Sequence, residues 1–216
     1  MEKIFNVPTL YALKIKIISG VFNSIRFLWW RNSFDSVKLL HEKIRTKKGA
    51  KVFEIGSGSG FIYETITKNN IEVNYSGTDL NKNMTDYCTT KFPDVSWYNF
   101  DKFPYNFKDN EFDIVVIWYV LHHVDTDENV ANILSEASRI GRKVILAESV
   151  QSYNHPLRIL KNLYWKITDG GRYYFNVKEL ENIFTRINCQ VDLVNVSEPL
   201  NQVAYIEFSK KNKDVL

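Results

Sequence analysis

The sequence predicts one α/β domain in which a mostly parallel β-sheet is covered by helices. From Lys51 onward, short β-branched and aromatic runs alternate with helical patterns at intervals of about 20 to 30 residues, which is the spacing of βαβ units. The 216 residues are 44% hydrophobic and 25% charged. That size and composition suit a single domain with a buried core.

The central part of the chain predicts five strands and one well-defined helix. The strands are expected near residues 51–55, 73–78, 95–98, 113–118 and 143–148. Asp125 or Thr126 is the expected N-cap of the helix between the last two strands. Its apolar side chains recur at the spacing of one helix face, at Val130, Ile133, Leu134 and Ala137. This face is expected to cover the sheet.

The C-terminal part predicts a further helix and a hairpin. Asn176 and Glu179 have the spacing of a capping box, which starts a helix that runs to about Ile187. Two runs of alternating polarity follow, at 191–196 and 203–208. They read as an antiparallel hairpin at the end of the sheet.

Composition and charge exclude several classes of protein. The apolar N-terminal run is interrupted by Lys14, Lys16 and Arg26, so a membrane-spanning helix and a secretory signal are not expected. The chain has two cysteines, neither at metal-ligand spacing, which favours a reducing cytoplasm without a disulfide framework and predicts no metal site.

The net charge of +3 is unevenly distributed. Ten basic against three acidic residues give residues 1–48 a net charge of +7, and 18 basic against 22 acidic residues give residues 49–216 a net charge of −4. Nucleic-acid binding needs many basic side chains to neutralise phosphates, and residues 49–216 carry a net negative charge instead. We therefore expect no nucleic-acid partner.

The most informative stretch is VFEIGSGSG at 52–60. An apolar strand that runs into Gly56, Gly58 and Gly60 allows a sharp turn and a close approach to a ligand, next to the N-terminal amides of a helix. Asp79 follows the next strand, where a carboxylate can accept hydrogen bonds from a ribose diol. The dinucleotide fingerprint would need glycine at Phe61, so a nicotinamide cofactor is not expected.

Four ordered motifs resemble those of the class I S-adenosylmethionine-dependent methyltransferases, and within them the branch of ubiquinone and menaquinone biosynthesis. They are VFEIGSGSG at 52–60, GTDLNKNM at 77–84, DKFPYNFKDNEFDIVV at 101–116 and IWYVLHHV at 117–124. A weaker similarity covers 170–184. The proline-glycine-glycine turn usual before the fifth strand is reduced to Gly141 in SRIGRK, which leaves the form of that turn open.

The resemblance implies a Rossmann-like, seven-stranded sheet with an antiparallel last strand, and S-adenosylmethionine as the cofactor. Glu54 would lie near the methionine amino group, Asp79 would bind the ribose and Leu80 would pack on the adenine. Asp101 would accept from the adenine amino group while Phe100 or Lys102 donates a backbone amide. The full set of implied cofactor-binding residues is Glu54, Gly56, Ser57, Gly58, Gly60, Asp79, Leu80, Phe100, Asp101, Lys102 and Ile117.

Candidate catalytic groups lie at the carboxyl ends of the fourth and fifth strands, namely Tyr119, His122, His123 and Glu148. Imidazole titrates near neutral pH, so His122 or His123 could remove a proton from the acceptor, and His123 occupies the position usual for histidine in the family. The alternative is that histidine is merely frequent at this helix start. Glu148 ends the otherwise apolar strand VILAE, for which a structural and a functional role are both open.

Two segments outside the motifs suggest how the acceptor is covered. Residues 1–48 are interpreted as a helical cap, and residues 49–216 as the methyltransferase domain with an acceptor-site insertion at 149–175. The apolar stripe from Leu10 to Leu28 fits core-facing helices, a lid, or a helix that makes peripheral membrane contact. The insertion is rich in aromatic residues, which suggests a flat or hydrophobic acceptor.

The sequence therefore predicts methyl transfer from S-adenosylmethionine to a small molecule, at oxygen or nitrogen rather than carbon. No metal is required by this reaction. The alternatives are a macromolecular (protein or RNA) methyltransferase and a catalytically silent module that only binds the cofactor. Against nucleic acid, IWYVLHHV lacks the asparagine- or aspartate-proline-proline-aromatic signature of base-amine methylation.

Overall fold

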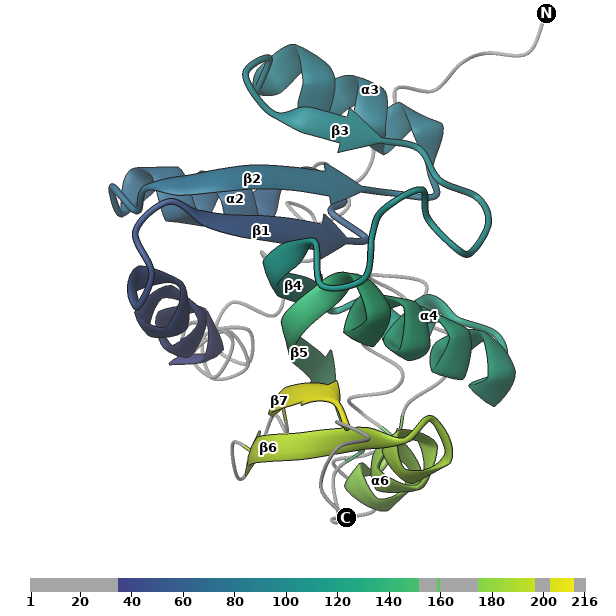
Figure 1. The fold of residues 1–216 in the computed structure, drawn as a ribbon. Helices are drawn as coiled ribbons and strands as arrows, with labels where there is room; N and C mark the ends of the chain where they lie inside the picture. Colours follow the sequence, from purple (N-terminus) through teal and green to yellow (C-terminus); the bar gives the residue numbers. More distant parts are fainter. Residues whose placement is uncertain (1–34, 152–158, 160–174, 197–202, 212–216) are drawn as a thin grey trace, which may run out of the picture.

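The computed structural model describes residues 35–151, 159, 175–196 and 203–211, and in this part of the chain a seven-stranded sheet has the order β3-β2-β1-β4-β5-β7-β6 (Figure 1). The strands are β1 (Ala50–Ile55), β2 (Val73–Thr78), β3 (Ser96–Tyr98), β4 (Phe112–Trp118), β5 (Gly141–Ser149), β6 (Cys189–Val196) and β7 (Val203–Lys210). The helices are α2 (Phe61–Lys68), α3 (Lys82–Lys91), the 3-10 turn η1 (Leu121–His123), α4 (Asp127–Ile140) and α6 (Val177–Arg186), and residues 35–45 are also helical.

The pairing confirms the predicted sheet. The pairs β1–β2, β2–β3, β1–β4 and β4–β5 are parallel, whereas β7 runs antiparallel to both β5 and β6. The chain passes outward from β1 to β3 and then returns to place β4 on the other side of β1. In open α/β sheets this reversal opens a crevice at the carboxyl ends of the two central strands.

The predicted elements agree with the structure, with differences at the ends. Thr126, not Asp125, caps α4 by accepting from the backbone amide of Asn129, and Asn176 and Glu179 form the predicted capping box of α6. β5 begins at Gly141, directly after α4 ends. A side chain at Gly141 would place Cβ 2.6 Å from Val115. The single glycine kept from the usual turn is therefore needed for close packing of α4 on β4.

Helices cover both faces of the sheet (Figure 1), and a hydrophobic core lies on each face. The first lies under α4 and α6 and includes Leu134, Ile140 and Phe184. The second lies under α2 and the helix at 35–45 and includes Ile62 and Leu40. Covering both faces explains the long buried apolar runs of the central strands, IVVIW at 114–118 in β4 and VILA at 144–147 in β5.

The helix at 35–45 belongs to the second core, although it falls within the predicted cap at 1–48. Val37, Leu40 and Ile44 are buried against the sheet, and Lys43 forms a 2.9 Å ion pair with the buried Glu207 of β7. The rest of the cap, residues 1–34, and most of the insertion at 149–175 lie outside the described residues. Among the residues that the structure does describe, no helix is long and apolar enough to cross a membrane.

We predict that Leu40→Ala lowers the free energy of unfolding by about 2–5 kcal/mol, because a fully buried leucine loses both its burial and its packing. Urea unfolding followed by circular dichroism measures this change. Lys38→Ala, on the exposed face of the same helix, should change it by less than about 0.5 kcal/mol. Equal effects of the two substitutions would show that this helix is not part of the core.

Candidate functional site

The glycine turn at 56–60 connects β1 to α2 and has a backbone that only glycine adopts readily. Gly56, Gly58 and Gly60 have φ values of 75°, 51° and 76°, in the left-handed region. At Gly56 a Cβ would also lie 2.4 Å from a methyl group of Val120. The turn is therefore held against the segment that follows β4, across the crevice.

The end of β2 fixes this turn through its backbone and through one carboxylate. The carbonyl of Thr78 accepts from the amides of Gly56 and Ser57 at 2.8 and 2.9 Å. Asp79 accepts from the Gly58 amide through Oδ2 and from the Asn81 amide through Oδ1, both at 2.8 Å. Each carboxylate oxygen can accept a second hydrogen bond, so Asp79 can also bind the hydroxyl groups of a ribose.

The segment after β3 is joined to the same point. Thr78 Oγ1 donates to the Tyr98 carbonyl at 2.9 Å and accepts from the Phe100 amide at 3.3 Å. Asn99 Nδ2 donates to the carbonyls of Asp79 and Leu80 at 2.7 and 3.0 Å. Sequence reasoning missed Thr78 and Asn99. Thr78 ends the predicted strand at 73–78 and Asn99 directly follows the one at 95–98, and this position could have marked both as candidates.

The surface around the turn is open and carries one exposed apolar side chain. Leu80 is 73% exposed beside Asp79. A Cβ added at Gly58 would meet no atom within 4 Å, so the turn is open there. The buried Ser57 hydroxyl has no hydrogen-bond partner in the described structure. No group of acidic, histidine and cysteine side chains among the described residues could hold a metal ion.

Glu54 lies in β1, just before the turn, and is buried. It accepts a 2.5 Å hydrogen bond from the Tyr75 hydroxyl of β2. Loss of solvation raises the pKa of Glu54 to about 8, the Tyr75 hydrogen bond opposes this rise, and the nearby charge of Asp79 adds to it. A ligand ammonium group beside Glu54 would favour the ionised form.

The other side of the crevice contains a buried histidine-glutamate pair. His122 Nδ1 lies 2.7 Å from Oε1 of Glu148, and both side chains are fully buried. Glu148 also accepts from the amides of Leu121 and Ser149, each at 2.7 Å. The carboxylate at the end of β5 therefore holds η1 in place. An ionised carboxylate can only accept, so opposite the carboxylate form of Glu148 the imidazole of His122 donates through Nδ1.

The remaining predicted residues differ in their exposure. Tyr119 is half-buried and has a φ of 54°, and its amide donates to the Ala147 carbonyl at 2.8 Å. His123 is exposed, with its ring centroid 4.1 Å from that of His122. Ile117 is fully buried in the first core. Asp101 and Lys102 are exposed in the segment that follows β3.

This sheet order, with a glycine turn at its reversal point and an acidic residue at the tip of β2, defines the class I methyltransferase fold. A family model described as a methyltransferase domain matches residues 29–194. The chain therefore belongs to the methyltransferase domain family.

Solved structures share this fold at low sequence identity. YcgJ from Bacillus subtilis has a TM-score of 0.65 at 14% identity, over 83% of this chain and 99% of YcgJ. An S-adenosylmethionine-dependent methyltransferase from Methanosarcina mazei has a TM-score of 0.63 at 19% identity, over 76% and 93%. Magnesium protoporphyrin IX methyltransferase from Synechocystis, with bound S-adenosylhomocysteine, has a TM-score of 0.62 at 16% identity, over 92% and 100%. No functionally curated protein matches the sequence.

We predict that Asp79→Ala weakens binding of S-adenosylhomocysteine by about 1–3 kcal/mol, the scale for loss of a charged acceptor. The expected cause is twofold, since Asp79 offers acceptors to the ribose and also holds Gly58. Isothermal titration calorimetry measures the dissociation constant. Asp86→Ala, which removes only an exposed ion pair with Lys82, serves as the control. Equal affinities of the two variants would contradict the role of Asp79.

A second prediction concerns the proton on Glu54. Because its pKa is about 8, the carboxyl is mostly protonated at pH 7, and an arriving ammonium group lowers that pKa. Binding of S-adenosylhomocysteine should therefore release up to one proton at pH 6–7 and progressively less above pH 8. Calorimetry in buffers of different ionisation enthalpy counts the protons.

Two controls isolate this effect. Methylthioadenosine lacks the amino-acid portion of S-adenosylhomocysteine and therefore its ammonium group, so it should bind without proton release. Glu54→Gln should release no proton with either ligand. Release that persists in Glu54→Gln would assign the proton to another group.

Proposed function

We propose that this enzyme methylates an oxygen or nitrogen atom of a small, aromatic or hydrophobic molecule, and that His122 removes the acceptor proton. The observation that carries the proposal is the buried pair of His122 and Glu148 at the carboxyl ends of β4 and β5. A methyl acceptor that begins as a hydroxyl must lose its proton as the methyl group arrives, and a positioned base assists this loss.

The cofactor would be held by residues from three loops. The glycine turn would approach its methionine portion, with Glu54 facing the amino group. Asp79 would bind the ribose and Leu80 would pack on the adenine. Asp101 would accept from the adenine amino group. Since the Phe100 amide already donates to Thr78, the Lys102 amide is the better candidate for the matching donor.

Each part of the chain has a limited task in the mechanism. When bound, S-adenosylmethionine supplies an electrophilic methyl group on a sulfonium centre. The protein brings the acceptor into line with that methyl group, and such positioning accounts for most of the expected acceleration. Glu148 holds His122 with Nδ1 as donor, so that Nε2 can accept the proton, as a carboxylate does for a catalytic histidine in hydrolases. His122 then carries the proton while Glu148 stabilises the resulting imidazolium.

Several observations support a small acceptor. The insertion at 149–175 contributes aromatic side chains in the sequence, although most of it lies outside the described residues. The structurally similar Synechocystis enzyme acts, by its name, on magnesium protoporphyrin IX, which is a flat macrocycle. The mildly acidic body at 49–216 gives little attraction for RNA. Peripheral membrane contact through the N-terminal residues would suit a hydrophobic acceptor.

The proposal is tested with methyl-labelled S-adenosylmethionine and an extract of the source cells, separated into small molecules, protein and RNA. We expect the label in the small-molecule fraction, and Asp79→Ala should reduce it. Label in protein or RNA would replace the proposal with macromolecular methylation. Cofactor binding without transfer to any fraction would favour the silent binding module.

On the acceptor found in this way, we predict that His122→Ala lowers turnover by about a hundredfold to ten-thousandfold, the usual share of a general base. Affinity for S-adenosylhomocysteine should stay within a few fold, because the glycine turn and Asp79 are unchanged. His123→Ala, at an exposed position, is the matched control and should keep turnover within a few fold. The proposal thus replaces the sequence-based preference for His123.

Glu148→Gln tests the positioning role separately. It should lower turnover less than His122→Ala and shift the lower limb of the pH–rate profile, because the carboxylate no longer stabilises the imidazolium. If all three variants keep turnover within a few fold, no proton is removed by this pair. The acceptor would then be an amine or thiolate that is already nucleophilic.

A further inference from the structure

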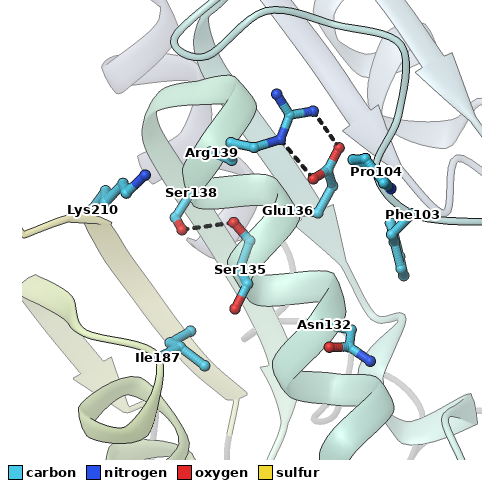
Figure 2. A pocket seen from close by; sticks show the side chains of 9 residues that line it. All are labelled: Phe103, Pro104, Asn132, Ser135, Glu136, Ser138, Arg139, Ile187 and Lys210. Atoms are coloured by element: carbon cyan, nitrogen blue, oxygen red, sulfur yellow. Dashed lines mark hydrogen bonds and ion pairs between the residues drawn. The ribbon is translucent and has the colours of Figure 1, made fainter.

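Two side chains on α4 hold the segment that follows the predicted adenine contacts. Arg139 donates to the carbonyls of Tyr105 and Phe107 at 3.0 and 2.8 Å and to Asp109 Oδ1 at 3.0 Å. It also donates twice to Glu136, at 2.7 and 2.9 Å. Figure 2 shows the two side chains facing each other on α4, with Phe103 and Pro104 beside them.

This pair differs from the surface ion pairs of the protein. Glu136 is 5% exposed, and besides Arg139 it accepts from the Tyr105 amide at 2.7 Å. The five hydrogen bonds of Arg139 use all five N–H donors of a guanidinium group. Both the amide and the carbonyl of Tyr105 are therefore bound by one helix. Such charge-assisted, multiply bonded groups define a geometry, whereas exposed single pairs contribute little.

The position of Tyr105 is transmitted to Phe100 by ring stacking. The Tyr105 ring lies 4.8 Å from the Phe100 ring at an interplanar angle of 25°, and Phe100 stacks in turn on Tyr98 at 5.1 Å and 7°. Phe100 is thus enclosed between an aromatic residue held by α4 and one at the end of β3. Asp101 is the next residue in the chain.

The span from Asp101 to Pro104 is consequently fixed at both ends. On one side, Thr78 and Asn99 bind the segment 98–100 to the end of β2. On the other side, Glu136 and Arg139 bind the segment 105–109 to α4. The span itself is exposed. Its path, and with it the place of the Asp101 carboxylate, depends on both attachments.

From this geometry we infer that Glu136 and Arg139 form a positioning pair for the adenine end of the cofactor site. Neither side chain is among the predicted cofactor contacts. They act through Tyr105 and Phe100 on Asp101, and so set how strictly the site requires the adenine amino group. The inference rests on the proposed function, in which Asp101 accepts a hydrogen bond from that amino group.

The test compares two ligands that differ only at the base. S-adenosylhomocysteine carries the adenine amino group, and S-inosylhomocysteine has an oxygen in its place. Calorimetry on the full chain gives both dissociation constants. We expect Arg139→Ala to weaken binding of S-adenosylhomocysteine by about three- to thirtyfold, the range for residues that act through others. Binding of S-inosylhomocysteine should change by less than about threefold, so the preference between the two ligands falls.

Two conservative substitutions and one control distinguish a change in ligand preference from a loss of folding. Arg139→Lys keeps the charge but cannot make five planar hydrogen bonds, and Glu136→Gln keeps the shape; both should reduce the preference in the same direction. Arg142→Ala removes a nearby arginine that is 67% exposed and 3.8 Å from Asp113, and it should leave the preference unchanged. Thermal unfolding of each variant shows whether loss of stability accompanies loss of preference.

The outcomes separate this inference from the proposed function. Equal loss of affinity for both ligands, in proportion to loss of stability, would assign the pair a purely structural role and overturn the inference. An unchanged preference in Arg139→Ala and Glu136→Gln would overturn it as well. If the unaltered protein binds neither ligand, the proposed cofactor site itself fails.

Discussion

The hydrogen bonds of Thr78 and Asp79 at the end of β2 are the constraint on which the rest of the site depends. Through them the glycine turn, the start of α3 and the segment after β3 converge on one point. The turn has little conformational preference of its own, because its three glycines have wide backbone freedom. Its shape is therefore imposed by the neighbouring strand. The acceptors that shape the turn belong to Thr78 and Asp79, and Asp79 is also the predicted ribose contact.

The sheet order brings the two halves of the site together. Because β4 lies next to β1, the segment after β4 reaches the glycine turn, and Val120 packs against the Cα of Gly56. On its other side this segment is attached to β5 by Glu148. A shift of the turn is therefore opposed by the same short segment that carries His122. Loops that are tied to neighbouring strands by packing and hydrogen bonds thus set the distance between the predicted cofactor and base positions.

Features with a local cause could be predicted from the sequence, and those with a distant partner could not. The caps at Thr126 and Asn176 and the turn at Gly56 depend on neighbours within a few residues, and their patterns are visible in the chain. The partner of Glu148 is 26 residues away and that of the Tyr105 amide is 31 residues away. Nothing in the pattern around either residue specifies the other.

The same reasoning explains the two largest gaps in the sequence-based picture. For residues 1–48 the sequence left core-facing helices, a lid and a membrane contact open, because an apolar face does not show which surface it covers. The helix at 35–45 lies in the second core, and the stripe from Leu10 to Leu28 lies outside the described residues. In the sequence Glu136 resembles the other charged residues of this amphipathic helix, yet it is only 5% exposed. Its spacing of three residues from Arg139 was the one available signal, but such pairs are common on exposed helix faces as well.

Glu54 shows why the arrangement suits a ligand better than it suits the free protein. The Glu54 carboxyl is buried, lies close to the charge of Asp79 and accepts from the Tyr75 hydroxyl; among the described residues, no cation contributes to its pKa shift. Burial of a charge under these conditions is costly, so the neutral acid is preferred. A raised carboxyl pKa means that the folded chain holds a proton which the unfolded chain has already lost above pH 4.5. The free energy of unfolding therefore falls as the pH rises from 4.5 toward 8. In the proposed function, the cofactor's ammonium group would reverse that preference, and the carboxyl group that weakens the free protein at alkaline pH would become a ligand contact.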